Sequence, residues 1–356
     1  MKWLLLLSFL LSLIACNHQA TSLTNSIPST EGSNGEDPTP TPAPTPIVDE
    51  GANLDEKLFI CSSLDFSSML APKDLSDIEI NVFALGLNIS ASFEGVQGWK
   101  NITNNFDGMG LSLGLLNQTL GTGSLQPLLV RMLEKHEAKM KAQYSEANYN
   151  SIKAMALEWK DDTGFIVNQI ETVDLFAPND SRWNALDEGD FASVQGAAES
   201  KSVAWALGNI YQDSNGRVFK ADWKTQLQTM ASSGEYRDLQ FAAARVLHNK
   251  AIGYVNAFSL SEIRSYLFMF DIVVQNGGFY QKNFDDFRSF MAANPNATEE
   301  QKLRALLASR LVQVRSQYRE DVRSRKEGII DGHGRVHQTD RNFETEYCYR
   351  SIEVIN

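Results

Sequence analysis

Apolar residues recur at spacings of three and four along most of the chain after residue 57, which is the period of an amphipathic helix. Helix-start signals precede these stripes at four places: Ser76 with Glu79, Ser145, Ser259 with Glu262, and Thr298 with Gln301. We expect the helix that starts after Ser259 to end at Gly277-Gly278. Stretches of strict alternation are few, so the pattern predicts a mainly α-helical domain.

The helical pattern is interrupted over residues 91–129, where glycine is frequent. Glycine in such a segment permits turns with positive φ and lets a ligand approach the backbone closely. We expect one small β-hairpin between residues 103 and 122, beside the helix that ends near Gly95. This is the region of the chain where a binding or catalytic site is most expected.

The N-terminal residues predict export. Lys2 precedes an almost unbroken apolar stretch of twelve residues, Trp3–Ile14, which is too short to span a bilayer and fits a signal peptide. The segment Leu13-Ile14-Ala15-Cys16 resembles the lipobox of bacterial lipoproteins, which implies cleavage after residue 15 and lipidation of Cys16. Because Asn17 is not an aspartate, the outer membrane is favoured in a cell that has one.

The segment that follows reads as a tether, and the rest as one domain. Residues 16–56 are rich in Ser, Thr, Gly and Pro, and PTPTPAPTP at 38–46 favours extended polyproline II. Residues 57–356 contain no second linker and no internal repeat, so we expect one domain. Its two cysteines, Cys61 and Cys348, are expected to form a disulfide in an oxidising compartment, with two free buried thiols as the alternative.

The net charge of −12 argues against a nucleic-acid partner, which needs a basic surface. We find no phosphate-binding or dinucleotide-binding motif, and we expect no cofactor. His333 and His337 have the spacing of two metal ligands on a helix, but the glycines around them disfavour a helix, so no metal site is expected.

Glu94 is the main candidate for catalysis. If a helix runs from Asp77 to about Gly95, this glutamate lies at the negative end of the helix dipole, and Phe93 and Trp99 could desolvate it. Both effects favour the protonated acid, which is the form that donates a proton to a glycosidic oxygen. Asp107, on a glycine-flanked turn, could face it across a groove. Spacing alone equally allows an exposed helix-end residue and a turn former.

A resemblance strengthens the candidate. Glu94 followed by Phe106-Asp107-Gly108-x-Gly110-x-Ser112-x-Gly114 is similar to the active-site region of chitosanases and other members of the lysozyme superfamily. The resemblance implies a lysozyme-like α+β fold. It also implies that Glu94 is the general acid, that Asp107 is the base, and that Ser112 orients the attacking water.

Exported lysozyme-like proteins of this group often have Leu-Gln-Trp-Asn where this chain has Leu116-Asn117-Gln118-Thr119. We expect Asn117 and Gln118 to contact substrate there, although the absence of tryptophan puts the sugar preference in doubt.

Two later segments resemble the same group in the same order: Phe270-Asp271-Ile272-x-x-Gln275-Asn276-Gly277-Gly278, and Asp321-Val322-x-x-Arg325 with the loop from Gly332 to His337. The resemblance places Asp271, Gln275 and Asn276 along the sugar groove. Polar groups that cap the helix end are the alternative. Arg323, Arg325 and His337 are expected to make structural ion pairs or hydrogen bonds.

The sequence therefore predicts a monomeric, exported and lipid-anchored glycosidase that cleaves β-1,4 bonds of peptidoglycan, with deacetylated, glucosamine-containing glycan as an open preference. A non-catalytic peptidoglycan-binding lipoprotein is the alternative, and a structural envelope lipoprotein is a third class. The G-x-S-x-G pattern of residues 110–114 also matches the nucleophile elbow of an esterase, but that motif needs a strand before it, a helix after it and a parallel sheet. For Trp183, Trp205 and Trp223, sequence does not separate sugar stacking from packing.

Overall fold

The computed structural model describes residues 52–166 and 196–348. The expected signal peptide, the lipidated Cys16, nearly all of the tether and Trp183 lie outside these residues. All described residues belong to one compact unit, Asp49–Asn356. Among them, no helix has the length and apolar character needed to cross a membrane.

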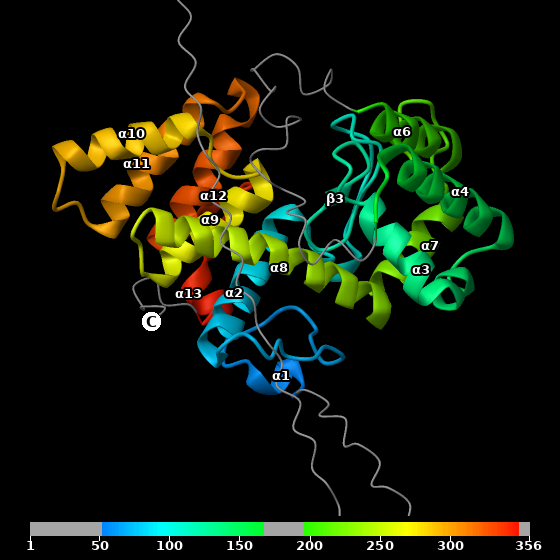
Figure 1. Ribbon diagram of the computed structural model, residues 1–356, viewed down its shortest axis with the longest axis horizontal. Coiled ribbons are helices and arrows are strands. Elements are labelled where there is room, and N and C mark those ends of the chain that lie inside the picture. The colour runs from blue at the N-terminus through cyan, green and yellow to red at the C-terminus, as the bar shows by residue number, and fades with distance from the viewer. Residues whose placement is uncertain (1–51, 167–195, 349–356) are drawn as a thin grey trace, which may run out of the picture. The chain divides into compact units, whose positions relative to one another are not determined.

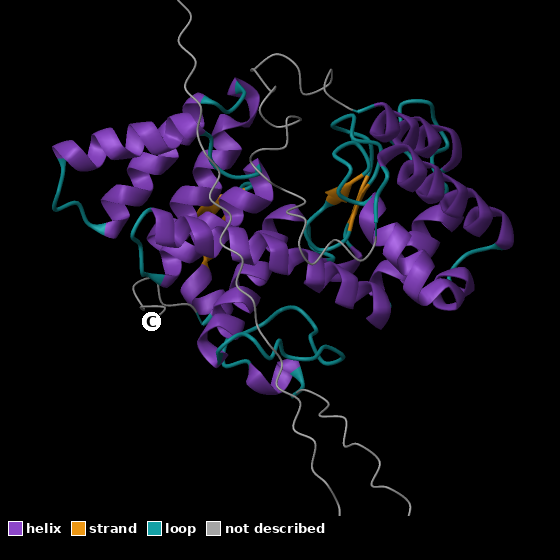
Figure 2. Cartoon of the chain, in the orientation of Figure 1, coloured by secondary structure: helices purple, strands orange, loops and turns teal. Residues whose placement is uncertain are grey.

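The described chain is mainly helical, as the periodicity predicts (Figures 1 and 2). Its helices are α1 (Leu54–Lys57), α2 (Asp77–Glu94), α3 (Gln126–Ala142), α4 (Glu146–Thr163), α6 (Ala197–Asn209), α7 (Ala221–Ser232), α8 (Gly234–Ala257), α9 (Ile263–Asn276), α10 (Gln281–Ala293), α11 (Glu299–Val312), α12 (Arg319–Asp331) and α13 (Phe343–Tyr347). Single 3-10 turns lie at Gly98–Lys100 and Ser316–Tyr318.

Two small antiparallel sheets accompany the helices. Strands β1 (Ile102–Thr103), β2 (Ser112–Leu113) and β3 (Gln118–Thr119) form one sheet in that order, and β4 (His333–Val336) pairs with β5 (Thr339–Asn342) in the other. The hairpin expected between residues 103 and 122 is present as β2–β3, with β1 added at its edge. The second hairpin was not expected from the sequence.

Two hydrophobic cores meet along α8. Phe241, Leu247 and Tyr254 of this helix pack in the core that contains α2, α9 and α12. Tyr236 and Leu239, at its N-terminal end, pack in the core that contains α3, α4 and α7. Figure 1 shows α8 passing between the two groups of helices. The helix therefore holds both cores in one unit.

Capping explains most helix boundaries. Ser76 and Glu79 form the expected capping box of α2, and Thr298 and Gln301 form that of α11. Ser145 caps α4, and Gly277, in the left-handed conformation with φ 70°, ends α9.

The expected start of α9 at Ser259 is wrong. The helix begins at Ile263, and Ser259 has a left-handed φ of 51°. Glu299, from the first turn of α11, accepts hydrogen bonds from the backbone N–H groups of Ser261 and Glu262 at 2.8 and 3.0 Å. The residues just before α9 are thus held by a carboxylate from another helix, and not by a side chain of their own segment. The local sequence pattern does not predict this contact.

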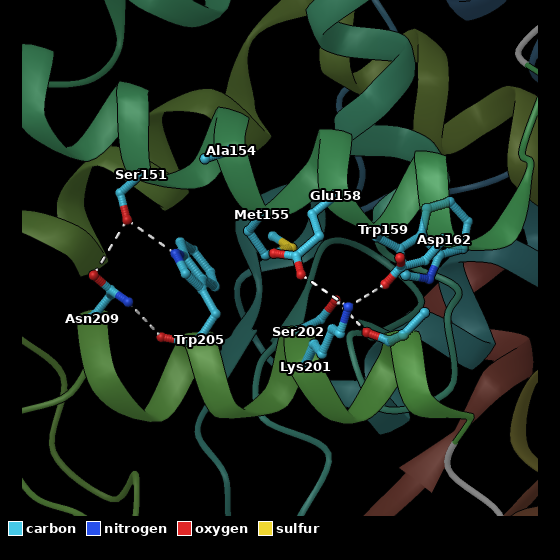
Figure 3. Close-up of a pocket in the computed structure, with 11 residues that line it drawn as sticks. Ser151, Ala154, Met155, Glu158, Trp159, Asp162, Lys201, Ser202, Trp205 and Asn209 are labelled. Carbon is cyan, nitrogen blue, oxygen red and sulfur yellow. Dashed lines mark hydrogen bonds and ion pairs between the residues drawn. The ribbon is translucent and has the colours of Figure 1, made fainter.

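A disulfide joins Cys61 to Cys348, with their Cα atoms 5.3 Å apart, as expected. It connects the segment that precedes α2 to the residue that follows α13. A cavity of about 310 Å³ lies between α4 and α6 (Figure 3).

Candidate functional site

Glu94 is the last residue of α2, as the sequence predicts. The helix is buried along most of its length, whereas the Glu94 side chain keeps 17% of its surface exposed. Gly95 follows it in an extended conformation, and a Cβ atom at this position would lie 2.1 Å from Oδ1 of Asn101. A glycine is therefore required for Asn101 to approach the helix end.

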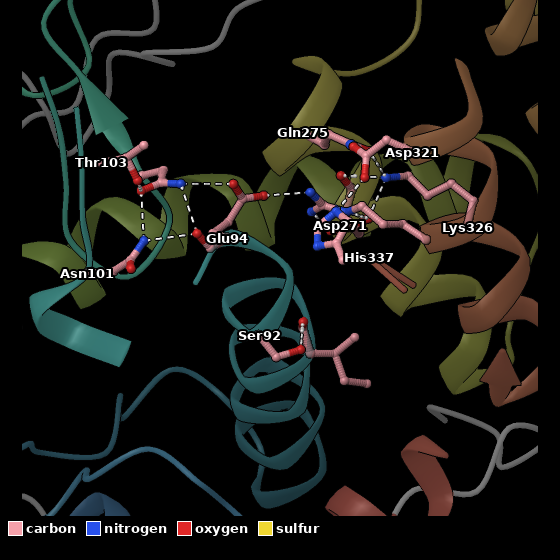
Figure 4. Close-up of polar contacts among 12 residues, drawn as sticks. Ser92, Glu94, Asn101, Thr103, Asp271, Gln275, Asp321, Lys326 and His337 are labelled. Atoms are coloured by element: carbon pink, nitrogen blue, oxygen red, sulfur yellow. Dashed lines mark hydrogen bonds and ion pairs between the residues drawn. The ribbon is translucent and has the colours of Figure 1, made fainter. Parts of the chain in front are cut away.

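Three side chains hold the end of α2 (Figure 4). Nη1 of Arg325 donates to Oε1 of Glu94 at 2.8 Å, and Nδ2 of Asn117 donates to Oε2 at 3.1 Å. Nδ2 of Asn101 donates to the backbone oxygen of Glu94 at 3.0 Å and to Oδ1 of Asn117 at the same distance. The carboxylate is thus fixed from two directions, by a cation and by an amide.

The backbone conformation of Asn117 allows its side chain to reach Glu94. It lies in the turn between β2 and β3 with a left-handed φ of 50°, which non-glycine residues rarely adopt. Its amide contacts both the carboxylate and the backbone oxygen of Glu94. Strained backbone of this kind is found more often at functional sites than elsewhere.

Behind Glu94 lies a buried group of charges. Nη2 of Arg325 donates to Oδ1 of Asp271 at 2.6 Å, and Nζ of Lys326 contacts Oδ2 of the same carboxylate. The side chains of Asp271 and Lys326 are fully buried, and that of Arg325 is 3% exposed. Asp271 therefore sits between two cations, one of which also binds Glu94.

Burial and charge oppose each other in this group. Burial disfavours the ionised Asp271, but Arg325 and Lys326 outweigh it and hold the pKa of Asp271 below its usual range. Burial lowers the pKa of Lys326 to about 8, and Asp271 partly opposes this effect. For Arg325, burial is outweighed by Asp271 and Glu94, which raise its pKa. Arg325 consequently keeps its charge beside Glu94.

The network continues toward the surface. Lys326 donates to Oε1 of Gln275 at 2.7 Å, and Nε2 of Gln275 donates to Oδ2 of Asp321 at 2.6 Å. Oδ1 of Asp321 pairs with Nε2 of His337, whose side chain is 48% exposed. Figure 4 shows these groups extending from Glu94 to the hairpin of β4 and β5. Gln275 is thus a link in the network.

The environment expected for Glu94 differs from the one observed. The ring of Phe93 packs against the guanidinium of Arg325, with 4.7 Å between Cζ and the centre of the ring. Trp99 packs edge-on against Phe66 and donates to the backbone oxygen of Asp65 at 2.9 Å. Arg325, which the sequence assigned only a structural role, is the charged partner of Glu94, and desolvation of the carboxyl group by Phe93 and Trp99 stays a prediction.

Asp107 and Ser112 are not joined to Glu94. Asp107 is exposed, and its carboxylate accepts a hydrogen bond from the backbone of Met109 at 3.1 Å. Ser112 is 3% exposed in the central strand β2. No hydrogen bond or ion pair within residues 52–166 and 196–348 connects either side chain to Glu94. Their roles as base and water-positioning residue remain predictions.

The two remaining residues predicted to contact substrate, Gln118 and Asn276, differ in how far they are buried. Gln118 is 6% exposed in β3, which leaves it little surface for a ligand. Asn276 is half-buried, and its backbone oxygen accepts from Nη2 of Arg310 at 3.1 Å. The group that caps this carbonyl is therefore Arg310 of α11, and not one of the α9 side chains named in the alternative interpretation.

The competing motifs lack their structural contexts. Residues 110–114 surround a short antiparallel strand, whereas a nucleophile elbow needs a strand-to-helix turn on a parallel sheet. His333 and His337 lie on the β4–β5 hairpin. Among the residues that the structure describes, no group of three potential metal ligands is found.

Comparison with family models, with curated proteins and with solved structures finds no match for this chain. The resemblance to the lysozyme superfamily thus depends on the sequence motifs.

Sequence reasoning missed Asn101 and Lys326. Asn101 follows a 3-10 turn in a segment without periodicity, and Lys326 belongs to the charged run Arg323-Ser324-Arg325-Lys326-Glu327, which is typical of a solvated helix face. One signal was available for Asn101. The glycine at position 95 indicates a close approach of another group.

Proposed function

We propose that this protein is a glycoside hydrolase in which Glu94 donates a proton to the glycosidic oxygen. The observation that carries the proposal is the placement of the Glu94 carboxyl group. It is partly exposed at a helix end, and it is held by Arg325 and Asn117 in front of a fully buried charge network. Preorganised support of this kind is what a group that transfers a proton requires.

A second carboxylate completes the proposal. Cleavage of a glycosidic bond needs a group that activates water or stabilises the positively charged sugar ring. Asp107 is our candidate, since it is exposed on the loop between β1 and β2, and the sequence resemblance assigns it this role. Ser112, in the adjoining strand, is the candidate for orienting the water.

Arg325 and Asn117 have a positioning role in this proposal. Each binds a different oxygen of Glu94, so the carboxyl group cannot rotate without losing a hydrogen bond. Arg325 is itself held by Asp271, which fixes the position of the guanidinium. The supporting charges thereby restrict the acid to one orientation.

We further propose peptidoglycan as the substrate, with the preference for acetylated or deacetylated glycan as the question to be tested. The lipobox-like segment and the Pro-rich segment support an exported protein anchored through Cys16. Digestion of native and chemically deacetylated sacculi by the same preparation would decide the acetylation preference.

The decisive experiment compares the wild type with Glu94→Gln on purified sacculi. We expect Glu94→Gln to keep the circular dichroism spectrum of the wild type while releasing no reducing ends. Its melting temperature should fall, because the buried Arg325 keeps only one of its two carboxylate partners. Glu344→Gln, an exposed change in α13 with the same loss of charge, is the control and should retain activity. Wild-type-like release by Glu94→Gln would refute the proposal. The same assay with Asp107→Asn tests the second carboxylate.

A non-catalytic glycan-binding protein is the second candidate. One observation favours it: Glu94 is bound by a permanently charged arginine, which suits a fixed carboxylate better than a proton donor. In that case the wild type co-sediments with sacculi and releases no soluble saccharide.

A further inference from the structure

The cavity between α4 and α6 lies apart from the Glu94 network, with which it shares no residue. It is lined by Ser151, Ala154, Met155, Glu158, Trp159 and Asp162 of α4 and by Ala198, Lys201, Ser202, Trp205 and Asn209 of α6. Its volume of about 310 Å³ lies at the lower end of the range of small-molecule sites, about 300–1,000 Å³. It is large enough for a ligand the size of a monosaccharide or an amino-acid side chain.

Polar contacts between α4 and α6 close the cavity at its two ends (Figure 3). At one end, Nζ of Lys201 reaches Glu158 at 3.0 Å and Asp162 at 2.7 Å. At the other end, Nε1 of Trp205 donates to Oγ of Ser151 at 3.0 Å. The space between them is left open by small side chains, of which Ser202 turns back to the backbone oxygen of Ala198.

The donor and acceptor groups that line the cavity differ in how many hydrogen bonds they can still form with a ligand. Its two indole N–H groups, its two hydroxyl groups and its ammonium group already donate to neighbouring protein atoms. Each carboxylate, by contrast, binds Lys201 through one oxygen, so the second oxygens of Glu158 and Asp162 remain able to accept. Glu158, Asp162 and Lys201 form the solvent-exposed rim of the cavity, with 59%, 36% and 53% of their side chains exposed, and two carboxylates there meet one ammonium. The cavity therefore suits a ligand that donates hydrogen bonds and carries positive charge.

The apolar residues that line the cavity place a second requirement on the ligand. Met155 is buried, and Trp205 is half-buried with its ring packed edge-on against Trp223, 5.6 Å away. An indole ring beside carboxylates is a favourable environment for an organic cation, because the ring attracts positive charge while its face packs against carbon atoms. A bare metal ion would leave this apolar surface unused.

We propose that this cavity binds a small primary amine. The ammonium group donates to Glu158 and Asp162, and the carbon skeleton packs against Trp205 and Met155. A glucosamine unit and a lysine-type side chain share this chemistry.

Calorimetric titration of the full chain tests the proposal and separates the two sources. The probes are D-glucosamine, N-α-acetyl-L-lysine amide and the uncharged N-acetyl-D-glucosamine. Saturable binding of either amine, with N-acetyl-D-glucosamine at least tenfold weaker, is the expected result. Binding of glucosamine alone identifies an amino sugar, and binding of the lysine derivative alone identifies an amino-acid side chain. Equal binding of the uncharged sugar, or no binding of either amine, overturns the proposal.

Matched variants locate the binding. Glu158→Gln combined with Asp162→Asn should weaken amine binding at least tenfold. Glu146→Gln combined with Asp161→Asn removes the same charge from exposed positions of α4 outside the cavity and should leave the affinity unchanged. The titration measures amine binding and not turnover, so a failure of the proposed hydrolase activity does not affect this result. Normal affinity in the first pair would refute the site.

Discussion

Arg325 donates a 2.8 Å hydrogen bond to Glu94 across 231 positions of sequence, and the same guanidinium binds Asp271. The end of α2 is therefore attached to α9 and α12 through one side chain. Because Arg325 is buried and always charged, its two carboxylate partners compensate for its desolvation. This relationship makes the candidate acid dependent on residues far from it in the chain.

Asn117→Gly should separate positioning from folding. Glycine adopts the left-handed φ of 50° without strain, so the free energy of unfolding should change little, whereas both amide contacts to Glu94 are lost. We expect kcat on sacculi to fall by about tenfold, equivalent to about 1.4 kcal/mol, with KM changing less. An unchanged kcat would show that Asn117 does not support the reaction.

Asp271→Asn should destabilise the protein strongly. The substitution leaves Arg325 and Lys326 buried with too little negative charge beside them, and breaking a buried ion pair in this way typically costs about 3–5 kcal/mol. Urea unfolding at pH 7 measures the loss. Asp285→Asn, which removes a surface ion pair with Arg288, should have a much smaller effect. Similar losses in the two variants would contradict the role given to the buried network.

His248 should make the protein less stable in mild acid. Its ring is 2% exposed, and Nδ1 is 2.8 Å from the hydroxyl of Tyr266. Burial, assisted by the charge of Arg245, lowers its pKa from 6.5 to about 4, which corresponds to roughly 3 kcal/mol. Between these values the unfolded chain binds the proton more tightly, so stability is lost as the pH falls from 6.5 to 4.

Urea unfolding between pH 4 and 7 tests this dependence. His248→Gln lacks the titrating group and should lose less stability over that range than the wild type. Parallel curves for the two proteins would exclude His248 as the cause.

The disulfide should contribute substantially to stability. Its partners are 287 positions apart, and chain-entropy reasoning gives roughly 5 kcal/mol as an upper value for so long a loop. We expect Cys61→Ser with Cys348→Ser to melt at a lower temperature than the wild type. The wild type under reducing conditions should behave like the variant, and an equal melting temperature in all three samples would refute the prediction.

The sequence predicted those helix boundaries that depend on local signals. Ser76 with Glu79 located the start of α2, and Gly277 located the end of α9, because the capping groups lie within a few residues of the helix end. The start of α9 was misplaced because the backbone just before it is held by Glu299, which belongs to another helix. Local patterns do not contain information of that kind.

The same limit applies to the candidate site. The position of Glu94 at the end of α2 was predicted correctly, because it follows from the length of one helix and the glycine after it. Its environment was not, since Arg325 and Lys326 come from α12 and are brought there by packing. A run of charged residues gives no indication of which members turn inward, so the ion pairs were visible only in the structure.

The bond between Cys61 and Cys348 has one further consequence. Because Cys61 and Cys348 are bonded, the chain between them forms a covalent ring. A protease that cuts one peptide bond between the two cysteines therefore opens the ring without releasing a fragment. A domain nicked once would migrate as a single species on a non-reducing gel and as two after reduction. A protein built in this way stays in one piece after a first cleavage.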